Sequence, residues 1–230
     1  QLGIMFFALV LAVGTVSSIS LFTDRLEKAL LAETKEFLGG DLKFESNDLI
    51  EDEAYLEIED LNVKKSEMVL FASMLSSGEK LQLASIKAVD DNYPLIGGIE
   101  IKSRSETLYV KQPPDESEVW LDKRLIDILD LTIGQNVGIG DANFILSHSI
   151  ISEPDRASNS YAFAPKAIIN MKDLEKTNVV QPGSRVRFAS VYLDSKEKIL
   201  KVESILERIK QPGDDIRRSE DANDSLGKAI

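Results

Sequence analysis

Few side chains in this chain of 230 residues could carry out chemistry, because it contains one histidine and no cysteine. The histidine, His148, lies within the apolar run 144–151, and no G-x-S-x-G sequence offers the exposed serine of a hydrolase triad. We interpret His148 as a histidine of a β-sheet and predict no catalytic residue. A membrane-anchored hydrolase stays an alternative, which an assay with a generic ester would test.

The acidic clusters and the paired glycines also have simple structural interpretations. Residues 51–53 and 214–215 lack the D-x-D-x-D-G order of a calcium loop, and one histidine without cysteine cannot build a typical zinc site. The pairs Gly97-Gly98 and Gly138-x-Gly140 do not open a helix of a βαβ unit, as a phosphate-binding loop would. We therefore predict solvated acidic faces and turn glycines, with no metal and no cofactor.

The net charge of the chain is −12, which excludes several classes of partner. Nucleic-acid binding requires patches of lysine and arginine that neutralise phosphate, so no nucleic-acid partner is predicted. The same charge argues against a soluble part that lies on anionic lipid. The absence of cysteine excludes a disulfide framework.

The N-terminal residues predict the element that organises the rest of the chain. Residues 1–22 carry no charge, and at 1.5 Å per residue they reach about 33 Å, enough to cross a hydrocarbon core of about 30 Å. Residues 23–38 continue as a charged amphipathic helix, which Gly39-Gly40 ends. We predict one transmembrane helix that continues into a stalk over residues 1–38. A signal sequence and a buried core helix are the alternatives. Because the first residue is not methionine, we expect a segment of a longer protein.

The stalk half of this helix carries an apolar stripe. Phe22, Leu26, Leu30 and Phe37 recur at helical spacing, and charged residues take the remaining surface. A stripe of this kind outside the membrane requires a second helix or a domain to cover it.

The remaining residues predict an α+β body over 39–212 and an acidic, solvated linker over 213–230. The clearest signal is a β-hairpin of residues 66–75 and 80–89, joined by a four-residue link with glycine. Further strands are expected at 41–46, 99–102, 144–151, 167–169 and 185–193. Helices are expected at 49–61, at 120–129 with Leu121, Leu125, Ile128 and Leu129 on one face, and from Asp194, where Asp194 and Glu197 have the spacing of a capping box.

Several blocks of this sequence together resemble a known family. The blocks are VSSISLFTDRLEKALLAETKEFLGGDL (16–42), AVDDNYPLIGGI (88–99), VWLDKRLIDILDLTIGQNVGIGDANF (119–144), ISEPDR (151–156) and APKAIINMKDLEKTNVVQPGSRVRF (164–188). Their order and spacing resemble the first extracytoplasmic domain of the FtsX/MacB-like ABC transporter permeases, within the YbbP-like branch. The resemblance covers essentially the whole chain.

This resemblance implies a fold, a location and a set of partners. The implied fold is a mixed α/β periplasmic domain of two lobes on stalk helices, in the bacterial inner membrane, with residues 213–230 leading toward a second membrane helix. The implied partners are the rest of the permease, membrane lipid and a cytosolic ATPase whose work moves the periplasmic domain, which is called mechanotransmission. The branch is associated with hydrophobic substrates and an esterase-type partner. Because no G-x-x-x-x-G-K-[ST] sequence is present, ATP hydrolysis is expected on a separate subunit and this chain is not expected to be an enzyme.

Two hypotheses for the function follow. In the first, the chain couples ATP hydrolysis to periplasmic movement and export of a hydrophobic substrate, through the stalk residues Phe22, Leu26, Leu30 and Phe37 and the returning residues Leu226 and Ile230. In the second, it is a membrane-anchored module without a transport role, which captures a lipid or another apolar ligand between its lobes.

Overall fold

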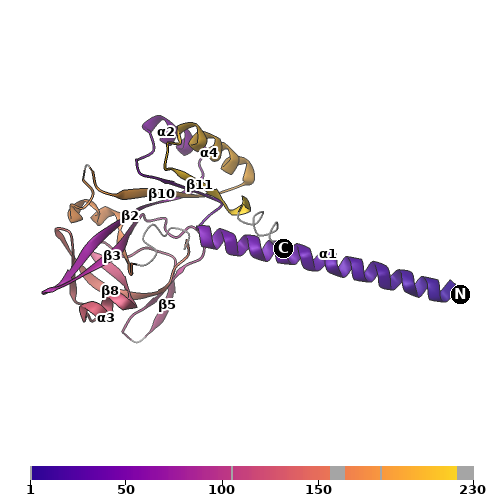
Figure 1. Ribbon diagram of the computed structural model, residues 1–230, viewed down its shortest axis with the longest axis horizontal. Helices are drawn as coiled ribbons and strands as arrows, with labels where there is room; N and C mark the ends of the chain where they lie inside the picture. Colours follow the sequence, from indigo (N-terminus) through magenta and orange to yellow (C-terminus); the bar gives the residue numbers. More distant parts are fainter. Residues whose placement is uncertain (1, 105, 156–163, 182, 222–230) are drawn as a thin grey trace.

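The computed structural model describes residues 2–104, 106–155, 164–181 and 183–221. Its first element is helix α1, Leu2–Leu38, which projects from the body as a single rod of 37 residues, about 55 Å long (Figure 1). Among the described residues, it is the one helix that is long and apolar enough to cross a membrane. It ends as predicted at Gly39, whose φ of 86° places it in the left-handed region and whose amide donates to the carbonyl oxygen of Lys35 at 2.8 Å.

The body is built on one mixed β-sheet. Among the described residues its eleven strands run in the order β11-β1-β10-β2-β3-β9-β6-β8-β4-β5, with β7 paired to β2 and β8. The bounds are β1 Leu42–Ser46, β2 Lys64–Ser77, β3 Lys80–Val89, β4 Ile99–Lys102, β5 Thr107–Val110, β6 Glu118–Asp122, β7 Asn136–Ile139, β8 Ala142–Ser152, β9 Lys166–Asn170, β10 Val186–Leu193 and β11 Asp215–Arg218. The helices after α1 are α2 Asp52–Asp60, α3 Lys123–Leu129 and α4 Lys196–Ile209, with 3-10 turns η1 Met171–Asp173 and η2 Glu175–Thr177.

The two ends of this sheet form two lobes. In the first lobe, α2 and α4 cover β1, β10 and β11, and the core includes Phe44, Tyr192 and Val202. In the second lobe, the remaining strands curve around a core that includes Phe71, Leu121 and Phe144, with Leu125 and Leu129 of α3 packed into it. Strand β2 is long enough to join both lobes, and α1 leaves the body between them (Figure 1). The mixed α/β fold with an apolar N-terminal helix is confirmed.

The helix expected at 120–129 is wrong in its first residues. Trp120 and Leu121 lie in strand β6 and are buried, and α3 begins only at Lys123. The carboxylate of Asp122 caps α3 by accepting from the amide of Arg124 at 2.9 Å. Ile128, expected on the buried face, is exposed. A strand that is buried on both faces does not alternate apolar and polar residues. Its apolar residues are therefore equally compatible with the start of a helix.

Two expectations about the C-terminal part are also wrong. Helix α4 begins at Lys196, and its N-cap residue Ser195 makes no side-chain capping bond, so the capping box of Asp194 and Glu197 does not form. The carboxylate of Asp194 accepts from the amide of Ser195 at 2.7 Å instead. The expected solvated linker contains strand β11, which pairs with β1 in the antiparallel sense. This strand is short and polar, and its partner is more than 160 residues earlier, so sequence periodicity does not reveal it.

Candidate functional site

The base of α1 is buried where the two lobes meet. Leu38, Gly39 and Gly40 are all buried, whereas the other described side chains of α1 are exposed or only partly buried. A Cβ atom at Gly40 would lie 2.4 Å from Cγ1 of Val191 and 2.7 Å from the carbonyl oxygen of Tyr192. Glycine is therefore required at position 40 by close packing against β10, whereas Gly39 ends the helix.

Backbone hydrogen bonds fix this base to both lobes. The amide of Asp155, which follows β8 in the second lobe, donates to the carbonyl oxygen of Glu36 at 2.9 Å. The amide of Asp41 donates to the carbonyl oxygen of Tyr192 in β10 at 2.9 Å. The first bond satisfies one of the carbonyl groups that a helix leaves without a partner at its C-terminus. A displacement of α1 along its axis would therefore act on both lobes.

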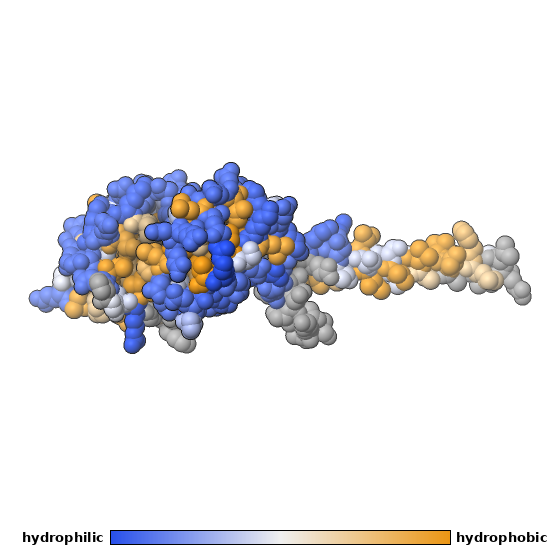
Figure 2. Space-filling view, turned by 90° about the horizontal axis from the view of Figure 1, so that it is seen from above, coloured by the Kyte–Doolittle hydropathy of each residue, from blue (hydrophilic) through white to orange (hydrophobic). Residues whose placement is uncertain are grey.

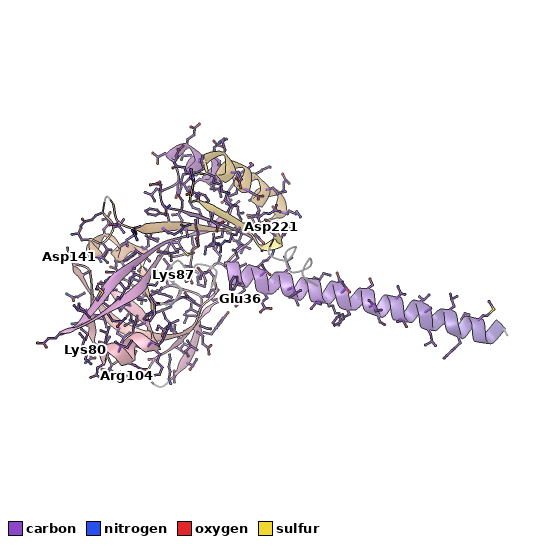
Figure 3. All side chains as sticks on the ribbon, viewed as in Figure 1. Glu36, Lys80, Lys87, Arg104, Asp141 and Asp221 are labelled. Carbon is purple, nitrogen blue, oxygen red and sulfur yellow. The ribbon has the colours of Figure 1, made fainter. Side chains whose placement is uncertain are left out.

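A buried ionic cluster lies next to the base of α1, which its residue Asp155 contacts. Lys87 of β3 forms ion pairs with Glu153 at 2.7 Å and with Asp155 at 2.8 Å, and all three side chains are at most 6% exposed. The hydroxyl of Tyr93 donates to Asp155 at 2.9 Å, and Lys166 of β9 also pairs with Glu153. Asp155, which pairs with Lys87, also bonds through its amide to Glu36 at the end of α1 (Figure 3 labels Lys87 and Glu36). We call Lys87, Tyr93, Glu153, Asp155 and Lys166 the buried cluster.

Burial and charge pairing oppose each other in the buried cluster. Burial alone would lower the pKa of Lys87, but the carboxylates of Asp155 and Glu153 raise it above its ordinary value. Burial alone would raise the pKa of Glu153, but Lys87 and Lys166 lower it to about 2. Burial raises the pKa of Asp155, and the charge of Glu153 adds to this effect. Lys87 and Glu153 therefore carry full charges at neutral pH, and the loss of Lys87 would remove one buried cation from two buried carboxylates.

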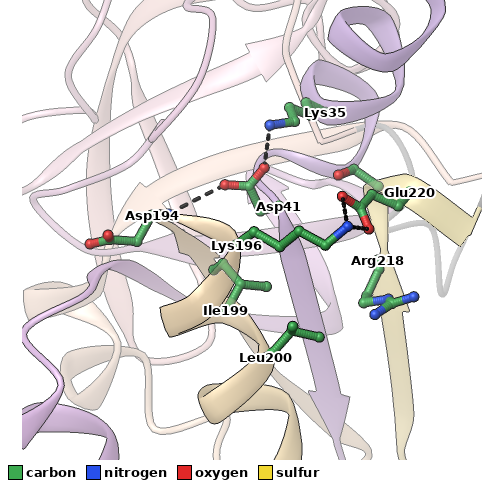
Figure 4. Close-up of a pocket in the computed structure, with 9 residues that line it drawn as sticks. Lys35, Asp41, Asp194, Lys196, Ile199, Leu200, Arg218 and Glu220 are labelled. Atoms are coloured by element: carbon green, nitrogen blue, oxygen red, sulfur yellow. Dashed lines mark hydrogen bonds and ion pairs between the residues drawn. The ribbon is translucent and has the colours of Figure 1, made fainter. Parts of the chain in front are cut away.

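A second set of polar contacts surrounds Asp41 on the other side of the base. Its carboxylate pairs with Lys35 of α1 at 2.5 Å and accepts from the amide of Asp194, before α4, at 3.3 Å (Figure 4). Its carbonyl oxygen accepts from the amide of Ser219, just after β11, at 3.0 Å. These residues line a cavity of about 80 Å³, well below the roughly 300 Å³ of a small-molecule site. Asp41 thus links α1, α4 and β11 structurally.

The predicted stalk residues lie along α1 as expected from their spacing, but little covers them. Phe22, Leu26 and Phe37 are exposed, and Leu30 is partly buried. Phe37 and Tyr109 line a groove of about 240 Å³ between the last turns of α1 and the end of β8. Leu226 and Ile230 lie outside the described residues. The role of these six residues in coupling stays a prediction.

His148, the residue considered for catalysis, packs against a side chain of the hydrophobic core. His148 packs edge-to-face on Trp120, with ring centroids 5.7 Å apart, and Trp120 is buried in the core. Among the residues that the structure describes, no three His, Cys, Asp or Glu side chains converge as metal ligands. The buried cluster was not predicted from the sequence. The sequence feature that could have indicated it is Lys87 within the apolar run 80–89, because a charge in a buried strand requires a partner of opposite charge.

The chain is similar to a known transporter component in sequence. It is 34% identical over 186 residues to a protein of Escherichia coli described as the uncharacterized ABC transporter permease YbbP. The match covers 81% of this chain and 22% of that protein, so the chain spans about a fifth of the length of its relative. A scan against protein-family models finds none that matches.

The fold is similar to that of a solved periplasmic region. The crystal structure of the periplasmic region of MacB from Actinobacillus actinomycetemcomitans matches with a TM-score of 0.52, at 13% identity, over 86% of this chain and 97% of that one. The extracellular domain of the ABC-type transporter YknZ from Gram-positive bacteria matches with a TM-score of 0.48, at 8% identity, over 74% of this chain and 89% of that one. The MacB match shows that the two-lobed body is a fold of MacB-like periplasmic regions.

Proposed function

This chain belongs to the ABC transporter permeases, since 81% of its residues align with such a permease, and we propose that it couples ATP hydrolysis to movement of its own periplasmic domain. The observation that carries the proposal is the base of α1. One unbroken helix leads from an apolar segment to a buried junction that contacts both lobes. A rod with fixed attachment transmits displacement, whereas a flexible linker does not.

The proposed function implies a position in the cell for each part of the chain. The apolar part of α1 crosses the bacterial inner membrane, the body lies in the periplasm, and a cytosolic ATPase subunit works through the rest of the permease. Phe22, Leu26, Leu30 and Phe37 contact another stalk helix, which the returning residues Leu226 and Ile230 lead into. The exposure of three of these four stalk residues supports a contact with a segment outside this chain's described residues. The family resemblance supports a hydrophobic exported substrate and an esterase-type partner protein.

A flexible joint in the stalk should uncouple hydrolysis from export. Gly-Gly inserted after Lys28 interrupts the rod between the membrane and the junction, because two glycines cost about 2 kcal/mol of helix stability relative to alanine. We expect the export of a fluorescent acyl lipid per ATP hydrolysed, measured in proteoliposomes with the assembled transporter, to fall severalfold.

The matched control is Ala-Ala inserted at the same position. It changes the length and the rotation of the helix equally but keeps it helical, so only flexibility differs between the two variants. Assembly with the ATPase, measured by co-purification, should be equal in both. Equal export per ATP by the two variants would contradict the proposal.

A further inference from the structure

The described part of the body contains a groove with the size and lining of a ligand site that the coupling function does not use. It lies between the two lobes, has a volume of about 450 Å³ and is lined mainly by apolar side chains. This volume is within the range of roughly 300–1,000 Å³ that small-molecule sites occupy. We call it the inter-lobe groove, and from its shape and charge we propose that it binds a cationic amphiphile, an apolar molecule with a single positive head group.

The sheet itself explains why the groove exists. Phe44, Ser190 and Tyr192 lie on one sheet face, and α2 and α4 cover that face over Phe44 and Tyr192. Further along the same face, Phe188 and Val69 are directly opposite each other in β10 and β2 and belong to the core of the second lobe. Between the two cores the face is left open. The groove is therefore the gap that forms where one sheet supports two separate cores.

The apolar walls of the groove come from both lobes. Ile50 and Tyr55 contribute from the α2 side, and Met171 and Leu174 contribute from the 3-10 turns, with Val69 and Phe188 on the floor. Figure 2 shows apolar patches among the mostly hydrophilic side chains of the body on the face seen from above. Since a ligand in the groove would contact both lobes, its binding would also oppose any change in their relative position.

The charges of the groove select the head group. Its lining includes three carboxylates, Asp52, Glu67 and Asp90. The ammonium of Lys65 lies 3.7 Å from the centre of the Tyr55 ring and offsets the charge of Glu67, so Asp52 and Asp90 leave the groove with an excess of negative charge. Glu67 is partly buried with Lys65 at 3.3 Å, and burial raises the pKa of Asp90, which accepts from Ser66 and from the amide of Glu67. Asp52 is exposed at the rim. A cationic head placed here gains attraction, and an anionic head is repelled from a chain of net charge −12.

Photo-crosslinking of the full chain in lipid nanodiscs tests this inference. The probe is a dodecyl-trimethylammonium with a diazirine in its chain, and the comparison is the dodecyl sulfate with the same diazirine. We expect the ammonium probe to label peptides that contain residues 49–55 or 171–174 about tenfold more than the sulfate, corresponding to about 1.4 kcal/mol. Both probes also enter the bilayer, so labelling of α1 serves as the internal reference.

The double variant D52N/E67Q should reduce the preference for the ammonium probe to about twofold or less. The matched control is E79Q/D115N, which removes two exposed carboxylates elsewhere and should leave the preference unchanged. Equal labelling of the groove by both probes, or labelling confined to α1, would overturn the inference. An unchanged preference in D52N/E67Q would overturn it as well.

Discussion

Lys87→Met should lower the free energy of unfolding of the body by about 3–5 kcal/mol. The variant leaves Glu153 and Asp155 buried behind the base of α1 without the cation that both of them contact. Methionine keeps an unbranched side chain that lacks only the terminal ammonium position, so most of the loss reports on charge rather than on a cavity. The chain has a single tryptophan, the buried Trp120, whose fluorescence can follow urea unfolding of the full chain in nanodiscs.

Two variants give this prediction its scale. Lys80→Met removes a lysine at the tip of the β2–β3 hairpin, where it is exposed and 3.7 Å from Asp130, and should change stability by less than about 0.5 kcal/mol (Figure 3). Tyr93→Phe removes only the hydroxyl that donates to Asp155 and should cost about 1 kcal/mol. A loss of stability in Lys87→Met as small as that in Lys80→Met would show that the buried cluster does not stabilise the junction.

Gly40→Ala should displace the base of α1 and destabilise the body by about 1–3 kcal/mol. The added methyl group would lie 2.4 Å from Val191 and 2.7 Å from the backbone of Tyr192, and the backbone cannot move aside without moving β10. The amides of Asp41 and Asp155 bond across this junction, so their hydrogen exchange, measured by mass spectrometry, should accelerate.

Gly14→Ala is the matched control for Gly40→Ala. An added methyl group at Gly14 meets nothing within 4 Å, and the residue lies in the apolar part of the same helix. It should leave both stability and exchange at the junction unchanged. Equal exchange rates in Gly40→Ala and the unmodified chain would show that the junction tolerates a wider packing than the structure indicates.

Local patterns predicted much of the fold correctly. The long apolar run gave α1, and Gly39-Gly40 gave its end. The hairpin of β2 and β3 followed from two apolar runs around Gly78. Strand β6 was mistaken for part of a helix because residues 119–121 are buried without alternation, and β11 was missed because its pairing with β1 is entirely non-local. These failures concern elements whose identity is decided by tertiary contacts.

The junction was predicted only in part for the same reason. Glycines at the end of α1 were predicted as a helix stop, whereas their close packing on β10 depends on Val191 and Tyr192, about 150 residues later. Lys87 and Asp155 are 68 residues apart, and no spacing rule connects them. The inter-lobe groove depends on two cores that share one sheet face, which no local pattern encodes. The second hypothesis from the sequence, an apolar ligand between lobes, now has a defined groove for its test.

The central claim is that α1 and the body move as one unit when the ATPase works. The chain has no cysteine, so spin labels can be placed at Lys28→Cys on α1 and Lys80→Cys on the hairpin, both on exposed side chains. In the assembled transporter, we predict that the distance between these labels is the same with and without trapped ATP. The distance from Lys80→Cys to a label in the membrane part of the permease should change between the two states. A change in the first distance as large as in the second would show a hinge at Gly39-Gly40 and would contradict the account.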